Sequence, residues 1–136
     1  MIEIKVQIEQ LPLKSVFRIA RGSKTQADVV VVKLSDGQHH GWAESVPYAR
    51  YGESVESVTE QIAELEQQLS PKTDKNINID ALIAAMPAGA ARNALDCAWW
   101  DLKAKQQGCT VAQLLSLGPA PACITAQTLS IDSPTA

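Results

Sequence analysis

The segment 88-AGAARNALDCAWWDLKAKQ-106 is the most strongly patterned part of the chain, and it decides the fold class. Its small and apolar residues recur every three or four positions, which predicts a helix with one buried face. Gly108 follows where helices commonly end. The many alanines indicate a scaffold helix against which another backbone packs closely. The expected apolar face consists of Ala91, Ala94, Leu95, Ala98, Trp99 and Leu102, widened by Ala90, Cys97 and Ala104.

The first 46 residues predict a three-stranded antiparallel meander. Apolar and polar side chains alternate at the start of the chain, and a run of valines and an Asp-Gly turn signal follow. The connection between the first two strands, residues 13–28, is expected to be a loop, and its length inside a compact domain favours a functional role. The expected strands are residues 2–8, 29–34 and 39–46.

Helical spacing begins after Ser54, a candidate N-cap, and a polar linker at 71–78 separates two helices before the long one. The order of strands and then helices predicts an α+β domain, in which a sheet packs against a helical bundle. Besides the long helix at 88–106, the expected helices are residues 55–69, 79–86 and 111–117.

The last residues predict the start of a second structural unit. Gly and Pro interrupt the helical pattern at 118–121, residues 124–131 alternate as in a strand, and 132–134 form a helix-start signal. A strand that leads directly into a helix is the first half of a β/α repeat. The expected domains are therefore residues 1–118 and a truncated second domain at 119–136, so the chain is expected to be a fragment of a longer protein.

The composition excludes several classes of protein. The chain has 136 residues and a net charge of −3, which argues against a general nucleic-acid binder. No apolar run approaches the roughly 20 residues that span a bilayer, and the N-terminus lacks a signal-peptide core. Cys97, Cys109 and Cys123 are an odd number without metal-ligand spacing, so reduced thiols in the cytoplasm are expected.

Two segments carry candidate ligand-binding residues. Cations in the expected loop offer charge-assisted hydrogen bonds to a carboxylate, although a solvated basic loop is an open alternative. Aromatic residues in the turn at 46–54 either face a ligand or serve only the turn, and Glu53 and Ser54 fit the start of the next helix. The candidates are Phe17, Ile19, Arg21 and Lys24 in the loop, and Tyr48 and Tyr51 in the turn.

Other polar residues favour a structural role. Asp96 and Asp101 are expected to lie roughly 140° apart around the helix, so they make a poor pair of carboxylates, and a hydrogen bond to backbone is expected for one or both. His39 and His40 have no third ligand nearby. The sequence also lacks a phosphate loop, a nucleophile elbow and an acid–base pair with a metal site, so neither a catalytic nor a metal-binding residue is assigned.

Four segments together resemble the N-terminal part of enolase-superfamily enzymes. Within that superfamily, the chain is most similar to the muconate-lactonizing-enzyme branch and its L-Ala-D/L-Glu (dipeptide) epimerases, and the resemblance covers nearly the whole chain. It implies an α+β capping domain followed by a β/α-barrel. The segments are PLKSVFRIARGSKTQADVVVVKLSDG, GWAESVPYARYGES, PAGAARNALDCAWWDLKAKQQG and ITAQTLSIDSP.

The resemblance implies magnesium-dependent removal of the proton α to a carboxylate. The carboxylates that hold the magnesium and the two lysines that act as base and acid lie on later barrel strands and have no counterpart in this sequence. The cap contributes the choice of substrate, through the regions around 17–24 and 48–51. Lys24 stands where related epimerases can have an arginine that meets an acidic side chain, and Thr128 resembles a substrate-contacting threonine.

The expected parent protein is thus a cytoplasmic isomerase acting on small acidic dipeptides from the bacterial cell wall, and this chain alone is expected to be inactive. One alternative is another enzyme of the branch, such as an o-succinylbenzoate synthase or a cycloisomerase. The other is a stand-alone binding or assembly module without catalysis. Neither nucleic acid nor a membrane is an expected partner, and exposed surface at 124–131 or on the cap predicts self-association.

Overall fold

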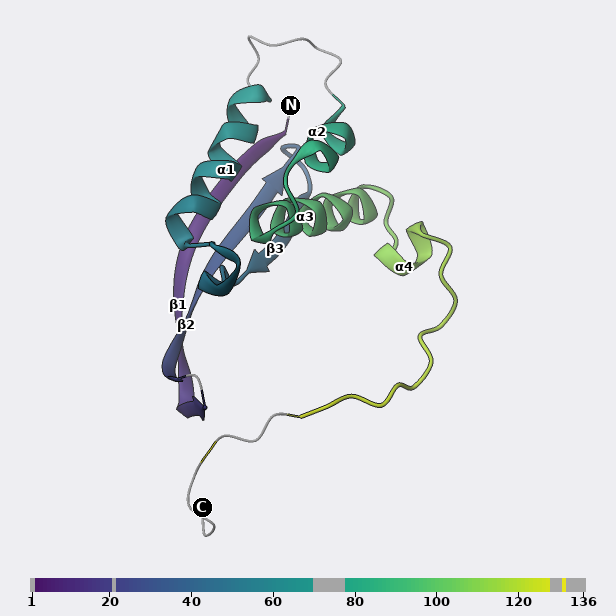
Figure 1. The fold of residues 1–136 in the computed structure, drawn as a ribbon. Helices are drawn as coiled ribbons and strands as arrows, with labels where there is room; N and C mark the ends of the chain where they lie inside the picture. The colour runs from purple at the N-terminus through teal and green to yellow at the C-terminus, as the bar shows by residue number, and fades with distance from the viewer. Residues whose placement is uncertain (1, 21, 70–77, 128–130, 132–136) are drawn as a thin grey trace.

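The computed structural model describes residues 2–20, 22–69, 78–127 and 131, and it confirms an α+β domain. Three strands come first, and helices follow on one side of the sheet (Figure 1). The elements are β1 (Glu3–Ile19), β2 (Gly22–Ser35), β3 (His40–Ser45), the 3-10 turn η1 (Ala49–Tyr51), α1 (Val55–Gln68), α2 (Ile79–Ala85), α3 (Ala90–Gln106) and α4 (Val111–Leu114).

The sheet is antiparallel with the strand order β1-β2-β3, so the predicted meander is confirmed. The turn between β2 and β3 uses Gly37 at a φ of 95°, a conformation that side chains with a Cβ disfavour. Asp36 completes the turn, because its carboxylate accepts hydrogen bonds from the backbone N–H groups of Gln38 at 2.8 Å and His39 at 2.6 Å. These bonds, with one from Gln106, hold the pKa of Asp36 well below its usual range.

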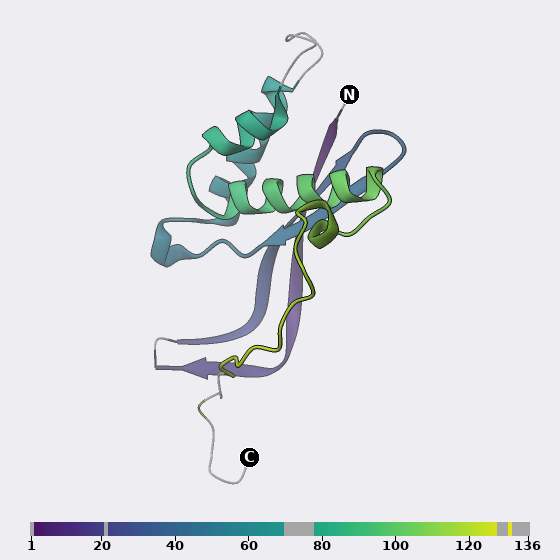
Figure 2. The ribbon, with the colours of Figure 1, turned by 90° about the vertical axis from the view of Figure 1, so that its right-hand side faces the viewer.

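The expectation of a loop at 13–28 is wrong, because β1 and β2 continue through it as a long hairpin. The outer part of this hairpin, residues 13–20 and 22–28, is here called the arm. The pairing runs from Glu3 opposite Ser35 to Ile19 opposite Gly22, with a register shift between Pro12 and Phe17. Figure 2 shows the arm projecting beyond the helices. Both of its faces are mostly exposed, so its sequence lacks the alternation that marks a strand with one buried face.

The core lies between the sheet and the helices, and α3 crosses the sheet closely at Gly41. A Cβ on Gly41 would collide with the carbonyl oxygen of Ala98 and lie 2.6 Å from the backbone nitrogen of Leu102. Asp101 of α3 also bonds to β3 beside this crossing, because its carboxylate accepts the N–H of Trp42 at 2.8 Å. This bond confirms the predicted hydrogen bond to backbone. The buried apolar residues are Ile4, Val29, Val30, Val32, Leu34, Val58, Ile62, Leu65, Ile83, Ala91, Ala94, Leu95, Ala98, Leu102 and Ala104.

The helix starts follow the capping signals in the sequence. Ser54 is the N-cap of α1, as predicted, and it exchanges hydrogen bonds with Ser57 in a capping box. Asn78 caps α2, which ends before Pro87. Thr110 caps α4, which is shorter than the expected helix at 111–117. Each helix in the described part of the chain is too short or too polar to span a lipid bilayer.

The strand expected at 124–131 is wrong where the structure describes it. Residues 118–127 have no regular secondary structure, and the side chain of Ile124 is fully exposed. A strand needs a neighbour to supply its hydrogen bonds, and no strand pairs with residues 118–127. Ile131 does contact β1, because its N–H donates to the carbonyl oxygen of Arg18 at 2.9 Å. Residues 71–77 of the linker expected at 71–78 lie outside the described residues, as does the helix-start signal at 132–134.

Candidate functional site

The segment that joins β3 to α1, here called the tyrosine turn (Val46 to Gly52), presents two aromatic rings to solvent. Gly52, at a φ of 74°, ends η1, and Tyr51 N–H donates to Tyr48 O at 2.8 Å. The two tyrosine rings lie 5.9 Å apart between centroids, with an angle of 44° between their planes. Tyr48 is 41% exposed and Tyr51 is 77% exposed, so both rings are available to a ligand.

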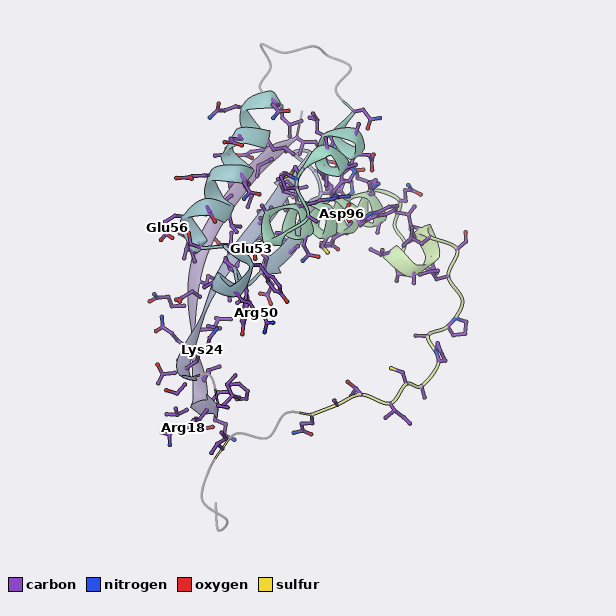
Figure 3. The ribbon with its side chains drawn as sticks, viewed as in Figure 1. Arg18, Lys24, Arg50, Glu53, Glu56 and Asp96 are labelled. Carbon is purple, nitrogen blue, oxygen red and sulfur yellow. The ribbon has the colours of Figure 1, made fainter. Side chains whose placement is uncertain are left out.

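Lys24 reaches the tyrosine turn from the arm. Its ammonium nitrogen lies 5.4 Å from the centroid of the Tyr48 ring, a cation–π contact between segments 24 residues apart in the sequence. The two residues line an open groove of about 710 Å³ between the arm and the turn, together with Arg50. Figure 3 shows Lys24 on the arm, beside the turn that carries Arg50. The groove is lined by two cations and by two carboxylates, those of Asp28 and Glu53, so its attraction for an anionic ligand depends on where the Lys24 ammonium stands and not on a net positive charge.

The remaining candidates on the arm differ in their surroundings. Phe17 is half-buried and pairs with Lys24 across the hairpin. Both residues line a smaller and more apolar groove of about 390 Å³ at the register shift. Ile19 pairs with Gly22 at the end of the hairpin, away from the tyrosine turn. The structure therefore places Phe17 opposite Lys24 and Lys24 over the Tyr48 ring, with Tyr51 beside Tyr48. The predicted Arg21 and Thr128 lie outside the described residues.

Glu53 is the residue of this region whose contacts the sequence did not reveal. One carboxylate oxygen, Oε1, accepts the N–H of Ala90 at 2.6 Å, and the other, Oε2, accepts the N–H of Tyr48 at 3.2 Å. Glu53 also lines the groove that Lys24 and Tyr48 share. Glu53 lies just before the N-cap of α1, so the sequence favours a role in starting that helix. The sequence gives no local signal for its contact with α3, which begins after Gly89.

The described residues do not form a metal centre. No three side chains among His, Cys, Asp and Glu come together there as metal ligands. His39 is engaged by Asp36, at 3.3 Å between Nδ1 and Oδ2. The groove between the arm and the tyrosine turn is lined by cations, carboxylates and the Tyr48 ring, which are groups of the kind that orient a polar ligand.

Residues 1–116 match the mandelate racemase / muconate lactonizing enzyme, N-terminal domain. The chain belongs to this family. Its match to the family's N-terminal domain confirms the resemblance to the enolase-superfamily cap, and the three-stranded sheet with its helices has the architecture of that cap.

Curated relatives include epimerases and racemases. The chain is 46% identical over 131 residues to L-Ala-D/L-Glu epimerase from Escherichia coli (strain K12), a match that covers 96% of this chain and 40% of the relative. It is 50% identical over 108 residues to N-acetyl-D-glutamate racemase from Pseudoalteromonas sp., over 79% of this chain and 33% of that relative. The chain thus spans well under half the length of either protein.

A solved structure with a similar fold comes from Agrobacterium tumefaciens. It is an enolase family member with homology to dipeptide epimerases, solved with bound sodium and L-Ala-L-Glu. The two structures superpose with a TM-score of 0.83 at 38% sequence identity, over 99% of this chain and 40% of the other.

Proposed function

We propose that residues 1–118 form the capping domain of an isomerase that inverts the α-carbon of an N-acylated glutamate, L-Ala-D/L-Glu in the first place, and that residues 119–136 begin its β/α-barrel. The support is the similarity to the Escherichia coli epimerase together with the groove between the arm and the tyrosine turn. The observation that carries the proposal is Lys24, whose ammonium stands over Tyr48 in that groove. A glutamate side chain is the kind of anion that such a site attracts.

The chain's own residues bind, orient and shield the substrate. Lys24 would pair with the side-chain carboxylate, while Tyr48 and Tyr51 pack against the rest of the molecule and reduce its contact with water. Arg21 and Thr128 remain proposed contacts on the strength of the resemblance. Closure of the cap over the barrel mouth would fix the substrate before reaction.

The chemistry itself is proposed to occur beyond the described residues. In the superfamily reaction a base removes the α-proton and an acid returns one on the opposite face, which inverts the centre. Magnesium supplies charge stabilisation to the substrate carboxylate when it is bound. The residues described here do not fit a magnesium site, so we place its ligands on the proposed barrel. A cytoplasmic role on peptides from the cell wall belongs to the same proposal.

A second candidate is racemisation of N-acetylglutamate, which the similarity to the Pseudoalteromonas enzyme favours. L-Ala-Glu and N-acetylglutamate are both N-acylglutamates, so the groove around Lys24 would serve either substrate. They differ in the free ammonium of the alanyl residue. Substrates that differ only in the acyl group therefore distinguish the two candidates.

A hybrid enzyme tests the proposal. In it, this chain replaces the matched segment of the Escherichia coli epimerase, so the barrel is constant and the cap is that of this protein. Deuterium exchange at the α-carbon is followed by proton NMR with L-Ala-L-Glu, N-acetyl-L-glutamate and L-Ala-L-Leu. Faster exchange of L-Ala-L-Glu supports the dipeptide epimerase, and faster exchange of N-acetylglutamate supports the racemase. A folded hybrid that exchanges neither would favour a cycloisomerase, an o-succinylbenzoate synthase or a module without catalysis.

A further inference from the structure

Glu53 links the tyrosine turn to the most buried helix of the domain. Its two carboxylate oxygens hold the backbone N–H of Ala90, at the start of α3, and the backbone N–H of Tyr48. The backbone of Glu53 is also tied to α1, because the next residue, Ser54, is the N-cap of that helix. One side chain thus sets the position of the turn relative to α1 and α3.

The bond to Ala90 replaces a cap that α3 lacks. Its N-cap residue is Gly89, which has no side chain to accept a hydrogen bond, and the first N–H groups of a helix have no acceptor within the helix. The negative charge of a carboxylate at a helix N-terminus is also favourable. Glu53 supplies both from a position 37 residues earlier in the sequence.

Gly89 leaves the space that this contact requires. A Cβ built on Gly89 would lie 2.7 Å from Oε1 of Glu53. The φ of Gly89 is 165°, which is extended backbone that any residue adopts, so its conformation does not demand glycine. An alanine at this position would therefore act on the contact, because its methyl group would displace the carboxylate from Ala90.

We propose that Glu53 is a positioning residue for substrate selection. By holding the backbone of Tyr48, it fixes the ring over which Lys24 is placed, and so it fixes where the Lys24 ammonium stands in the groove. This inference rests on the proposed function of that groove. Loss of either hydrogen bond would let the tyrosine turn move relative to α3, which weakens binding of an acidic substrate more than it affects the chemical step.

Amide hydrogen exchange on the 136-residue chain tests the contact without any activity. The Ala90 N–H has Glu53 as its partner, so its protection reports on that bond. Glu53→Gln keeps the size of the side chain but replaces one acceptor oxygen with an amide group, and Gly89→Ala displaces the carboxylate. In each variant we expect amide exchange to accelerate about tenfold at one or both of these positions, Ala90 and Tyr48. Glu60→Gln, an exposed change on the same helix α1, should leave both amides unchanged.

Kinetics of the hybrid enzyme test the selection step. Glu53→Gln and Gly89→Ala should raise KM for L-Ala-L-Glu about tenfold, with kcat within about twofold and a smaller change for the neutral isostere L-Ala-L-Gln. Protected central amides of α3, such as that of Leu102, would show that the fold is retained. Unchanged exchange at both amides, or equal kinetic losses for the two substrates, would overturn the inference. An unmodified hybrid without turnover would contradict the proposed function and the selection role together, while the exchange data would still show whether Glu53 holds the turn.

Discussion

Removal of the Lys24 ammonium is the substitution that most directly probes the proposed groove. Lys24→Ala deletes the cation that stands 5.4 Å from the Tyr48 ring centroid and leaves Arg50 as the remaining cation among the groove's described lining residues. Phe17, opposite Lys24 on β1, is unchanged by the substitution. The backbone of β2 should therefore keep its pairing, and the effect should be confined to the groove.

The expected magnitude follows from the exposure of Lys24. An ion pair at an exposed site contributes up to about 1 kcal/mol, whereas a hydrogen bond between charged groups that is shielded from water contributes about 1.5–3 kcal/mol. Lys24 is exposed in this chain, and substrate with a closed cap would shield it. We therefore expect a loss of about 1–3 kcal/mol for L-Ala-L-Glu, which is about 5- to 150-fold in kcat/KM.

The assay is α-deuterium exchange in the hybrid enzyme with L-Ala-L-Glu and L-Ala-L-Gln, which differ in charge and hardly in size. For the neutral dipeptide, kcat/KM should fall by less than about twofold, because its side chain has no carboxylate to pair with Lys24. Lys24→Arg keeps the charge, adds bidentate geometry and should retain the preference for glutamate. Equal losses for both dipeptides would refute the reasoning and make Lys24 a surface charge without a role in selection.

Three further predictions concern stability and association. Gly41→Ala should lower the free energy of unfolding by about 3 kcal/mol or more in urea titration, because its methyl group meets the backbone of α3, whereas Gly118→Ala meets open space and should be silent. Lys103 and Trp99 lower the pKa of Asp80, so the stability that Asp80 contributes is present above its unfolded pKa and is lost as the pH falls through the lower, folded value. Asp80→Asn should thus cost no more than about 1 kcal/mol at pH 7, since the side chain is 58% exposed, and the cost should shrink as the pH falls below 3.8, the ordinary pKa of the group; a cost that stays the same across the acid range would contradict this. Light scattering should show self-association of the chain, because β1 is an edge strand on which Ile8, Leu11 and Leu13 are exposed. Ile8→Lys should reduce this association, and a monomer at high concentration would contradict the expectation.

The parts of the fold that were predictable depend on local signals. The period of α3 appears in its alanines and Leu95, and the start of α1 appears in Ser54, so both helices could be placed from neighbouring residues. The turn at Asp36-Gly37 was likewise set by residues within the turn.

The arm escaped prediction because its stability comes from pairing and its faces are both solvated. Without a buried face, residues such as Lys14 and Gln26 leave no alternating pattern. The prediction of a final strand was wrong for the opposite reason. Its alternating sequence is typical of a strand, but Ile124 and its neighbours have no partner strand in the described chain.

The candidate site was predictable in its residue types and not in its geometry. The cations and the tyrosines could be named from their segments, but the approach of Lys24 to Tyr48 depends on the hairpin register. The role of Glu53 depends on Ala90, 37 residues away, and only a three-dimensional structure shows that contact.

The central claim is that this chain selects an acidic N-acyl amino acid for an epimerase. The most direct measurement is the ratio of α-deuterium exchange rates for L-Ala-L-Glu and L-Ala-L-Gln in the unmodified hybrid enzyme with magnesium, beside the 136-residue chain alone. We expect the hybrid to prefer the glutamyl dipeptide by at least about tenfold, which is about 1.4 kcal/mol, and the chain alone to show no exchange. Equal rates for the two dipeptides, or turnover by the chain alone, would contradict the account.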